Sequence, residues 1–154
     1  MKTEELKSLD ISGKNVLIIG CPASGKTYIS NLIADDSHKI IRSDDYIQYG
    51  FAESMYKCLE DISLMGSTHT IVEGVQGYRM LRKGVELNSY FPDIVIEVVI
   101  SEKTMNERYQ NERDPKKIKY LQGFGKAQQK ILNDYLALPN ERRPQWIKVE
   151  NDII

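Results

Sequence analysis

The sequence predicts an α/β fold built on one parallel β-sheet. Short segments rich in Val and Ile alternate with helical segments, a pattern typical of parallel strands joined by right-handed helical crossovers. One of these segments, 94–100, is apolar at nearly every position, as expected for a strand that is buried on both faces. The length of 154 residues fits one compact domain, so we expect 1–154 to form a single domain.

Five segments are expected to form the strands of this sheet. In chain order they are 15–19, 38–42, 70–73, 94–100 and 146–149. The first runs directly into a glycine-rich loop, and the third ends at Gly74. A parallel sheet binds its ligand at the carboxyl ends of its strands, so the residues that follow each strand are candidates for a functional site.

Helices are expected between the strands. They cover about 26–34, 45–60, 76–86, 101–113 and 114–136. Ser101 is placed to cap the fourth helix, and Asp114-Pro115 separates the fourth from the fifth.

A glycine-rich octapeptide joins the first strand to the first helix. It reads Gly20-Cys21-Pro22-Ala23-Ser24-Gly25-Lys26-Thr27. Its glycines let the backbone turn tightly and aim N–H groups at a phosphate, and the helix that follows adds the positive end of its dipole. Lys26 is expected to bind the β- and γ-phosphates, and the Thr27 hydroxyl to ligate Mg²⁺. The sequence therefore predicts a site for ATP, or another NTP, with Mg²⁺. We expect this site to include the residues from Gly20 to Tyr28.

Acidic residues follow the second and third strands. Only one of the neighbours Asp44 and Asp45 can point into the site. We expect Asp44 to orient an acceptor hydroxyl and accept its proton. Asp45 is expected to cap the next helix or to serve as a structural group beside the bound acceptor. Glu73, at the end of the third strand, is expected to hold a water molecule on Mg²⁺. Helix capping by both aspartates, and a solvated charge at Glu73, are the alternatives.

Further side chains near these acids are candidates for acceptor binding. Arg79 is expected to face the acceptor or its phosphate, with an exposed surface arginine as the alternative. Tyr46, Tyr49 and Phe51 are candidates for stacking on an acceptor base or sugar, although aromatic residues at such spacing more often pack in a core.

The segment after the fourth strand is locally basic. From 101 to 130 the chain carries eight basic and four acidic residues. Arg108 and Arg113 project about 140° apart on a straight helix. We expect one of them to neutralise the transferring phosphate and the other to pair with a neighbouring glutamate, with a solvated charged face as the alternative. The stretch 122–125 predicts a hinge.

Composition limits the classes of protein that remain. The net charge is −1, so any site for a polyanion must be a local patch. No apolar run approaches the roughly 20 residues that span a bilayer, and 1–10 contains no signal-peptide core. Cys21 and Cys58 lack metal-ligand spacing and predict two reduced thiols. These features predict a cytoplasmic protein with no membrane partner.

Two of these motifs together resemble a known family. Ile19 to Thr27, followed by Arg42-Ser43-Asp44-Asp45-Tyr46, resembles the kinase domain of phage-type polynucleotide 5′-hydroxyl kinases, which are small P-loop kinases related to adenylate kinase. The resemblance implies a P-loop NTPase three-layer αβα sandwich, a five-stranded parallel sheet of order 2-3-1-4-5, a helical lid over about 101–125 and ATP as donor. It also implies that Lys26 and Thr27 bind the phosphates and Mg²⁺ and that Asp44 is the general base. A lid arginine, best matched by Arg113, would stabilise the transition state.

The sequence departs from that family beside the acidic pair. Ile47 stands where the family typically has an arginine that grips an acceptor phosphate, and Ser43 where an arginine is common. Glu73-Gly74 is more similar to uridine kinases and phosphoribulokinases. We therefore expect an ATP-dependent kinase whose acceptor is a hydroxyl of a nucleic acid, either a 5′-OH end or the hydroxymethyl group of a modified DNA base. A small-molecule or nucleoside kinase and a non-catalytic nucleotide-binding regulatory protein are the alternatives.

Overall fold

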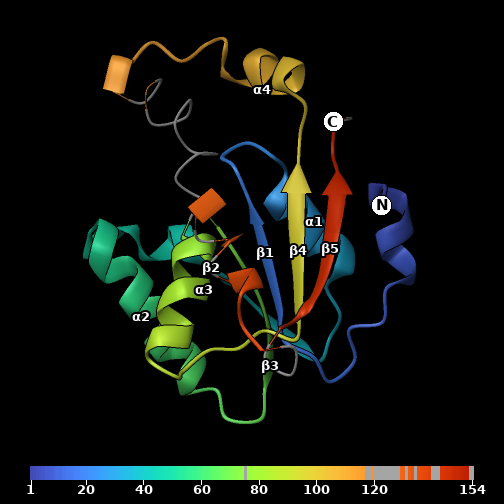
Figure 1. Ribbon diagram of the computed structural model, residues 1–154, viewed down its shortest axis with the longest axis vertical. Coiled ribbons are helices and arrows are strands. Elements are labelled where there is room, and N and C mark those ends of the chain that lie inside the picture. The colour runs from blue at the N-terminus through green and yellow to red at the C-terminus, as the bar shows by residue number, and fades with distance from the viewer. Residues whose placement is uncertain are drawn as a thin grey trace.

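The computed structural model contains one five-stranded parallel sheet with helices on both faces (Figure 1). It describes residues 1–74, 76–116, 119, 129–130, 132–133, 135–139 and 143–152. The strands are β1 (Val16–Gly20), β2 (His38–Arg42), β3 (His69–Glu73), β4 (Ile94–Val99) and β5 (Gln145–Glu150). Each lies within one residue of its predicted position.

The order across the sheet is β2-β3-β1-β4-β5, and every neighbouring pair is parallel. This is the order that the family resemblance implies. It puts β1 in the centre, so the loop that leaves β1 lies between the carboxyl ends of β3 and β4. The arrows of β1, β4 and β5 in Figure 1 point to that same edge, where α4 also lies.

One helix precedes β1, and the others lie between successive strands. The helices are η1 (Thr3–Ser8), α1 (Lys26–Ile33), η2 (Ser43–Tyr49), α2 (Phe51–Ser63), α3 (Gly77–Glu86) and α4 (Glu102–Tyr109), where η marks a 3₁₀ helix. Ser101 caps α4 as predicted, because its Oγ accepts a hydrogen bond from the Thr104 N–H at 3.2 Å. None of the described helices has the length and apolar composition needed to cross a membrane.

Side chains of β1 divide the core into two layers. Leu17 and Ile19 pack in a cluster with α2 and α3, whereas Val16 and Ile18 pack in a cluster with α1 and η1. This alternation follows from the two-residue period of a strand. All five residues of β1 are buried, which holds the start of the following loop rigidly in the middle of the sheet.

Two helix predictions need correction, and one cannot be compared in full. The helix predicted over 45–60 is two helices, because Gly50 adopts a φ of 89° and separates η2 from α2. The helix predicted to reach Arg113 ends at Tyr109, after which Gln110 and Asn111 form a turn. The helix predicted over 114–136, the lid over 101–125 and the hinge at 122–125 fall partly or wholly outside the described residues.

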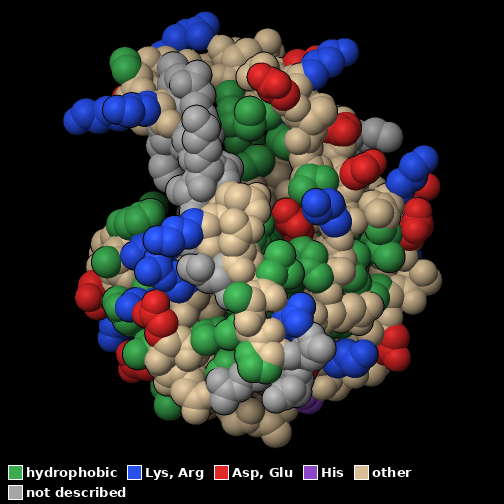
Figure 2. Space-filling view, in the orientation of Figure 1, with side chains coloured by type: hydrophobic (Ala, Val, Ile, Leu, Met, Phe, Trp, Pro, Cys, Tyr) green, Lys and Arg blue, Asp and Glu red, His purple; other side chains and the backbone are tan. Residues whose placement is uncertain are grey.

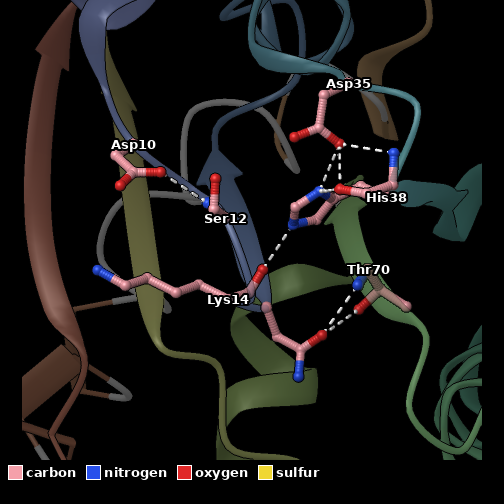
Figure 3. Close-up of polar contacts among 8 residues, drawn as sticks. Asp10, Ser12, Lys14, Asp35, His38 and Thr70 are labelled. Carbon is pink, nitrogen blue, oxygen red and sulfur yellow. Dashed lines mark hydrogen bonds and ion pairs between the residues drawn. The ribbon is translucent and has the colours of Figure 1, made fainter.

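The opposite edge of the sheet is held together by polar contacts between loops (Figure 3). The buried His38 ring lies between Asp35, at 2.6 Å from Nδ1, and the Lys14 carbonyl, at 2.7 Å from Nε2. Asn15 Oδ1 accepts hydrogen bonds from the backbone N–H and the hydroxyl of Thr70. These bonds join the starts of β1, β2 and β3 and leave the other edge for the site.

Charged side chains of both signs are interspersed over the face that Figure 2 shows. This distribution agrees with a net charge of −1. Both cysteines are free thiols, as predicted, with Cys58 buried and Cys21 half-buried.

Candidate active site

The loop from Gly20 to Thr27 leaves β1 and enters α1 through unusual backbone angles. Gly25 has a φ of 100° and Ala23 a φ of 63°, both in the left-handed region. A Cβ on Gly20 would lie 2.6 Å from Ser24 Oγ and 2.8 Å from the Val98 carbonyl oxygen, so only glycine fits there. Backbone geometry thus explains both glycines of the predicted phosphate loop.

The Lys26 side chain folds back across this loop. Its Nζ donates hydrogen bonds to the carbonyl oxygens of Gly20, at 3.0 Å, and Cys21, at 2.9 Å. Burial lowers the pKa of Lys26, and the neighbouring groups of Cys21, Glu73 and Asp44 oppose that shift. The ammonium group therefore lies inside the mouth of the loop, where an anionic ligand would replace lost hydration.

Thr27 and Glu73 come together as the two predicted magnesium residues. The Thr27 hydroxyl donates a hydrogen bond to Glu73 Oε1 at 3.3 Å, and Arg42 Nε lies 3.3 Å from the same oxygen. Burial raises the pKa of Glu73, while Lys26, Thr27 and Arg42 act in the opposite direction.

These donors fit a small divalent cation. A hydroxyl and a carboxylate are the hard oxygen groups that Mg²⁺ prefers, and Mg²⁺ takes its remaining ligands from water and phosphate. Among the described residues, no three His, Cys, Asp or Glu side chains gather as a metal site. Thr27 and Glu73 are thus the residues that would hold Mg²⁺ together with the phosphates of a nucleotide.

The structure separates the two neighbouring aspartates. Asp44 is exposed, yet it lies near enough to Lys26 and Glu73 to influence the pKa of each. Asp45 instead lines an open pocket of about 250 Å³ on the outer side of β2, together with Tyr46 and others. Asp45 does not cap an α-helix as predicted, because it lies in the first turn of η2 and Gly50 is the N-cap of α2.

The aromatic candidates differ in their surroundings. Tyr46 packs against the core, and its hydroxyl donates a hydrogen bond to Asp61. Tyr49 is 47% exposed and Phe51 is 61% exposed. Packing in the core thus explains Tyr46, but it does not explain the other two rings.

Arg79 is held at the start of α3 by Phe51, one of the aromatic candidates, and by Gln76, which the sequence did not single out. Its Nη1 donates a hydrogen bond to Gln76 Oε1 at 3.1 Å, and its guanidinium carbon lies 4.6 Å from the centre of the Phe51 ring. The buried Gln76 amide in turn donates to the Phe51 carbonyl and to Ser54 Oγ. The orientation of the Arg79 side chain therefore depends on Gln76, a polar residue shortly after β3, and on the Phe51 ring.

The two candidate arginines of the basic segment lie in different places. Arg108 Nη1 donates to the Ala23 carbonyl at 2.7 Å and Nη2 to the Asn151 carbonyl at 3.0 Å, so this arginine contacts the phosphate loop. Arg113 is exposed and its Nη1 donates to the Gln110 carbonyl at 2.9 Å. The structure brings Arg108, but not Arg113, to the loop.

Two residues at the loop were missed in the sequence. The Tyr109 hydroxyl donates to the Pro22 carbonyl, and Asn151 Nδ2 donates to the Ser24 carbonyl at 2.8 Å. Asn151 directly follows β5, so the rule that ligands bind after strand ends would have marked it. Tyr109 carries no such signal, because only the tertiary fold brings α4 beside the loop.

Comparisons with known proteins agree with this architecture. No family model matches the sequence, and no curated protein matches it either. Among solved structures, the chain is similar to an unliganded sugar kinase from Janibacter sp. HTCC2649, with a TM-score of 0.52, 17% identity, and 92% of this chain and 87% of that chain covered. It is also similar to thymidylate kinase from Candida albicans, with a TM-score of 0.50, 13% identity, and 90% and 83% coverage. The chain thus shares the fold of these two kinases, which in this chain is a three-layer α/β fold with strand order 2-3-1-4-5.

Proposed function

We propose that this chain is a phosphotransferase that moves the γ-phosphate of ATP to an acceptor hydroxyl. The observation that carries this proposal is the convergence of Lys26, Thr27, Glu73 and Asp44 at one edge of the sheet. Thr27 bonds Glu73, and Asp44 lies near enough to Lys26 and Glu73 to influence both pKa values. A phosphate loop alone would serve a nucleotide-binding protein, whereas a carboxylate opposite it supplies what transfer requires.

Each residue has a separate task in the proposed reaction. The loop amides and Lys26 bind the triphosphate and neutralise its charge. Thr27, and Glu73 through water, would hold Mg²⁺, which would supply electrostatic stabilisation of the phosphates. Asp44 orients the acceptor hydroxyl and takes its proton as the acceptor oxygen bonds to the γ-phosphorus. The bond from that phosphorus to the β–γ bridging oxygen breaks, and ADP leaves with the electron pair.

A lid arginine completes the proposed site. Arg108 and Arg113 are the two candidates to neutralise charge on the transferring phosphate. Arg108 already contacts the loop at Ala23, whereas Arg113 would reach the phosphate only after the segment that carries it moves closer.

For the acceptor, we propose a hydroxyl of a nucleic acid, either a 5′-OH end or the hydroxymethyl group of a modified DNA base. Support comes from the exposed rings of Tyr49 and Phe51 and from Arg79 stacked on Phe51. Aromatic rings beside a cation are suited to bind a base and a phosphate. A nucleoside or another small molecule is the second candidate. It is favoured by Figure 2, in which the described charged side chains on the face shown are of both signs.

Transfer from labelled ATP distinguishes these acceptors. The full chain is incubated with 5′-OH oligonucleotides, hydroxymethyl-containing DNA and free nucleosides, and the labelled products are separated. We expect label on the nucleic acids; label on free nucleosides alone would support the second candidate instead. Binding of ATP without transfer to any of a broad set of hydroxyl compounds would support a regulatory protein.

The general base is tested with a matched pair of variants. Asp44→Asn is expected to leave ATP binding almost intact and to lower transfer by about 10²–10⁴-fold. Asp45→Asn, one residue away and outside the loop mouth, is the control. Lys26→Ala is expected to weaken both binding and transfer. Unchanged turnover in Asp44→Asn would remove this residue from its role.

A further inference from the structure

Five consecutive carbonyl groups of the phosphate loop accept hydrogen bonds from side chains. Lys26 Nζ donates to the first two, which are the carbonyls of Gly20 and Cys21. The next three are Pro22, Ala23 and Ser24, and they accept from Tyr109, Arg108 and Asn151, respectively. Side chains therefore bond the carbonyl of each loop residue from 20 to 24, with Lys26 donating from the mouth of the loop and the other three donors from α4 and from the residue after β5.

These bonds determine where the amides of the loop point. A trans peptide is planar, so the N–H of one residue points away from the carbonyl of the residue before it. Donors on the Pro22 and Ser24 carbonyls thus turn the N–H groups of Ala23 and Gly25 to the opposite side. Inward N–H groups are what a phosphate loop uses to bind an anion.

The loop needs such support because part of it is strained. Ala23 has a φ of 63°, a left-handed conformation that costs free energy for any residue with a Cβ. The bonds to Tyr109 and Asn151 hold the carbonyls on either side of Ala23, at Pro22 and Ser24. Arg108 holds the carbonyl of Ala23 itself.

The Asn151 side chain is buried for this contact. It is 1% exposed and bonds the loop through Nδ2, while its buried Oδ1 has no hydrogen-bond partner within the described part of the chain. Its backbone N–H donates to Val99 at the end of β4, and its carbonyl accepts from Arg108. Asn151 thus ties the loop to β4 and to α4.

We propose that Tyr109 and Asn151 are positioning residues of the phosphate loop. They hold its carbonyls outward, and the inward amides then bind the phosphates of the nucleotide. This inference rests on the proposed function, because it assumes that the loop binds a triphosphate. It also makes α4, the first helix of the predicted lid, a support of the loop.

Two nearly isosteric variants test this role. Tyr109→Phe removes only the hydroxyl, and Asn151→Asp replaces the Nδ2 donor by an oxygen that repels the Ser24 carbonyl. Titration calorimetry measures the affinity of the full chain for ATP–Mg²⁺ and for adenosine, which lacks phosphate, and thermal unfolding measures stability. Tyr56→Phe and Asn106→Ala, both at exposed positions, are the matched controls.

We expect the variants to lose affinity only for the ligand that carries phosphate. Each variant should bind ATP–Mg²⁺ about tenfold more weakly, as one lost hydrogen bond implies, and should bind adenosine as well as the unmodified chain does. The KM for ATP should rise with the same factor. The control variants should match the unmodified chain.

Three outcomes would overturn the inference. Unchanged ATP affinity in a folded Tyr109→Phe variant would remove the positioning role and leave the proposed function intact. Equal losses for ATP and adenosine that track the melting temperature would show a structural role alone. Failure of the unmodified chain to bind ATP–Mg²⁺ would remove the proposed function, and the inference with it. Tyr109→Phe keeps the test decisive should Asn151→Asp fail to fold.

Discussion

The Thr27 hydroxyl lies 3.3 Å from Glu73 Oε1, so the start of α1 and the end of β3 meet in one hydrogen bond. Thr27→Val removes this hydroxyl at nearly constant volume, and Glu73→Gln removes the charge. We expect each change to raise the Mg²⁺ concentration for half-maximal transfer by about 10–100-fold, the usual effect of losing a group that orients a metal site. Mg²⁺ titrations of the reaction rate measure this. Thr68→Val, at an exposed position, is the control, and an unchanged Mg²⁺ requirement in Glu73→Gln would contradict the assignment.

The two candidate arginines should differ in what they change. Arg113 is exposed and bonds its own segment, so Arg113→Ala should leave the melting temperature unchanged. If it reaches the transferring phosphate, the same change should lower kcat by as much as about 10³–10⁵-fold. Arg108→Ala should weaken ATP binding as well, because Arg108 bonds the Ala23 carbonyl. Single-turnover kinetics and thermal unfolding separate these effects. An unchanged kcat in Arg113→Ala would exclude Arg113 as the residue that neutralises the transferring phosphate.

Gly74 should tolerate no side chain. Its φ is 135°, and an added Cβ would collide with the side chain of Ser43. Gly13→Ala is the matched control, since Gly13 also has a positive φ, 68°, but open space around it. We expect Gly13→Ala to cost about 1–2 kcal/mol of unfolding free energy from strain alone. Gly74→Ala should cost about 1–3 kcal/mol more because of overpacking. Urea unfolding measures both, and equal costs would show that the contact with Ser43 relaxes freely.

The two cysteines should react very differently with alkylating reagents. Burial raises the pKa of Cys58 to about 12, so its thiol stays protonated from pH 7 to pH 9 and lacks the reactive thiolate. Cys21 is half-buried in the phosphate loop. Iodoacetamide at pH 8 should therefore modify Cys21 in the folded chain and reach Cys58 only after unfolding.

ATP–Mg²⁺ should protect Cys21 from the same reagent, because the loop that carries it would be covered by phosphate. Mass spectrometry of the peptides gives the extent of modification at each cysteine. Labelling of Cys58 in the folded chain at pH 8 would contradict the burial argument. Equal labelling of Cys21 with and without nucleotide would argue against phosphate binding at the loop.

Local signals explain why most of the fold could be predicted. The strand that ends at Gly20 and the turn through Gly25 depend on residues adjacent in sequence, and the alternation of strands with helices favours a parallel sheet. The break at Gly50 was missed because helical composition continues on both sides of it. The glycine itself, which adopts a φ of 89°, was the available signal.

The support of the phosphate loop could not be predicted in this way. Tyr109 and Asn151 bond loop carbonyls that lie 87 and 127 positions away in the chain. The strand-end rule marks the position of Asn151, but no local pattern encodes either contact, because both exist only after β4 has joined β1 and β5 has joined β4. The same holds for Gln76, whose hydrogen bonds to Phe51 and Ser54 depend on how α2 packs beside α3.

The strand order brings two groups of site residues to the phosphate loop from opposite sides of β1. With β1 in the centre, Asp44, Glu73 and Arg79 arrive from the flank formed by β2 and β3, whereas Arg108, Tyr109 and Asn151 arrive from the flank formed by β4 and β5. Under the proposed function, the residues from the β2–β3 flank select the acceptor. The residues from the β4–β5 flank support the loop that binds the donor, ATP. Substitutions on the β2–β3 side could therefore change the acceptor, while the residues after β4 and β5 that support ATP binding stay the same.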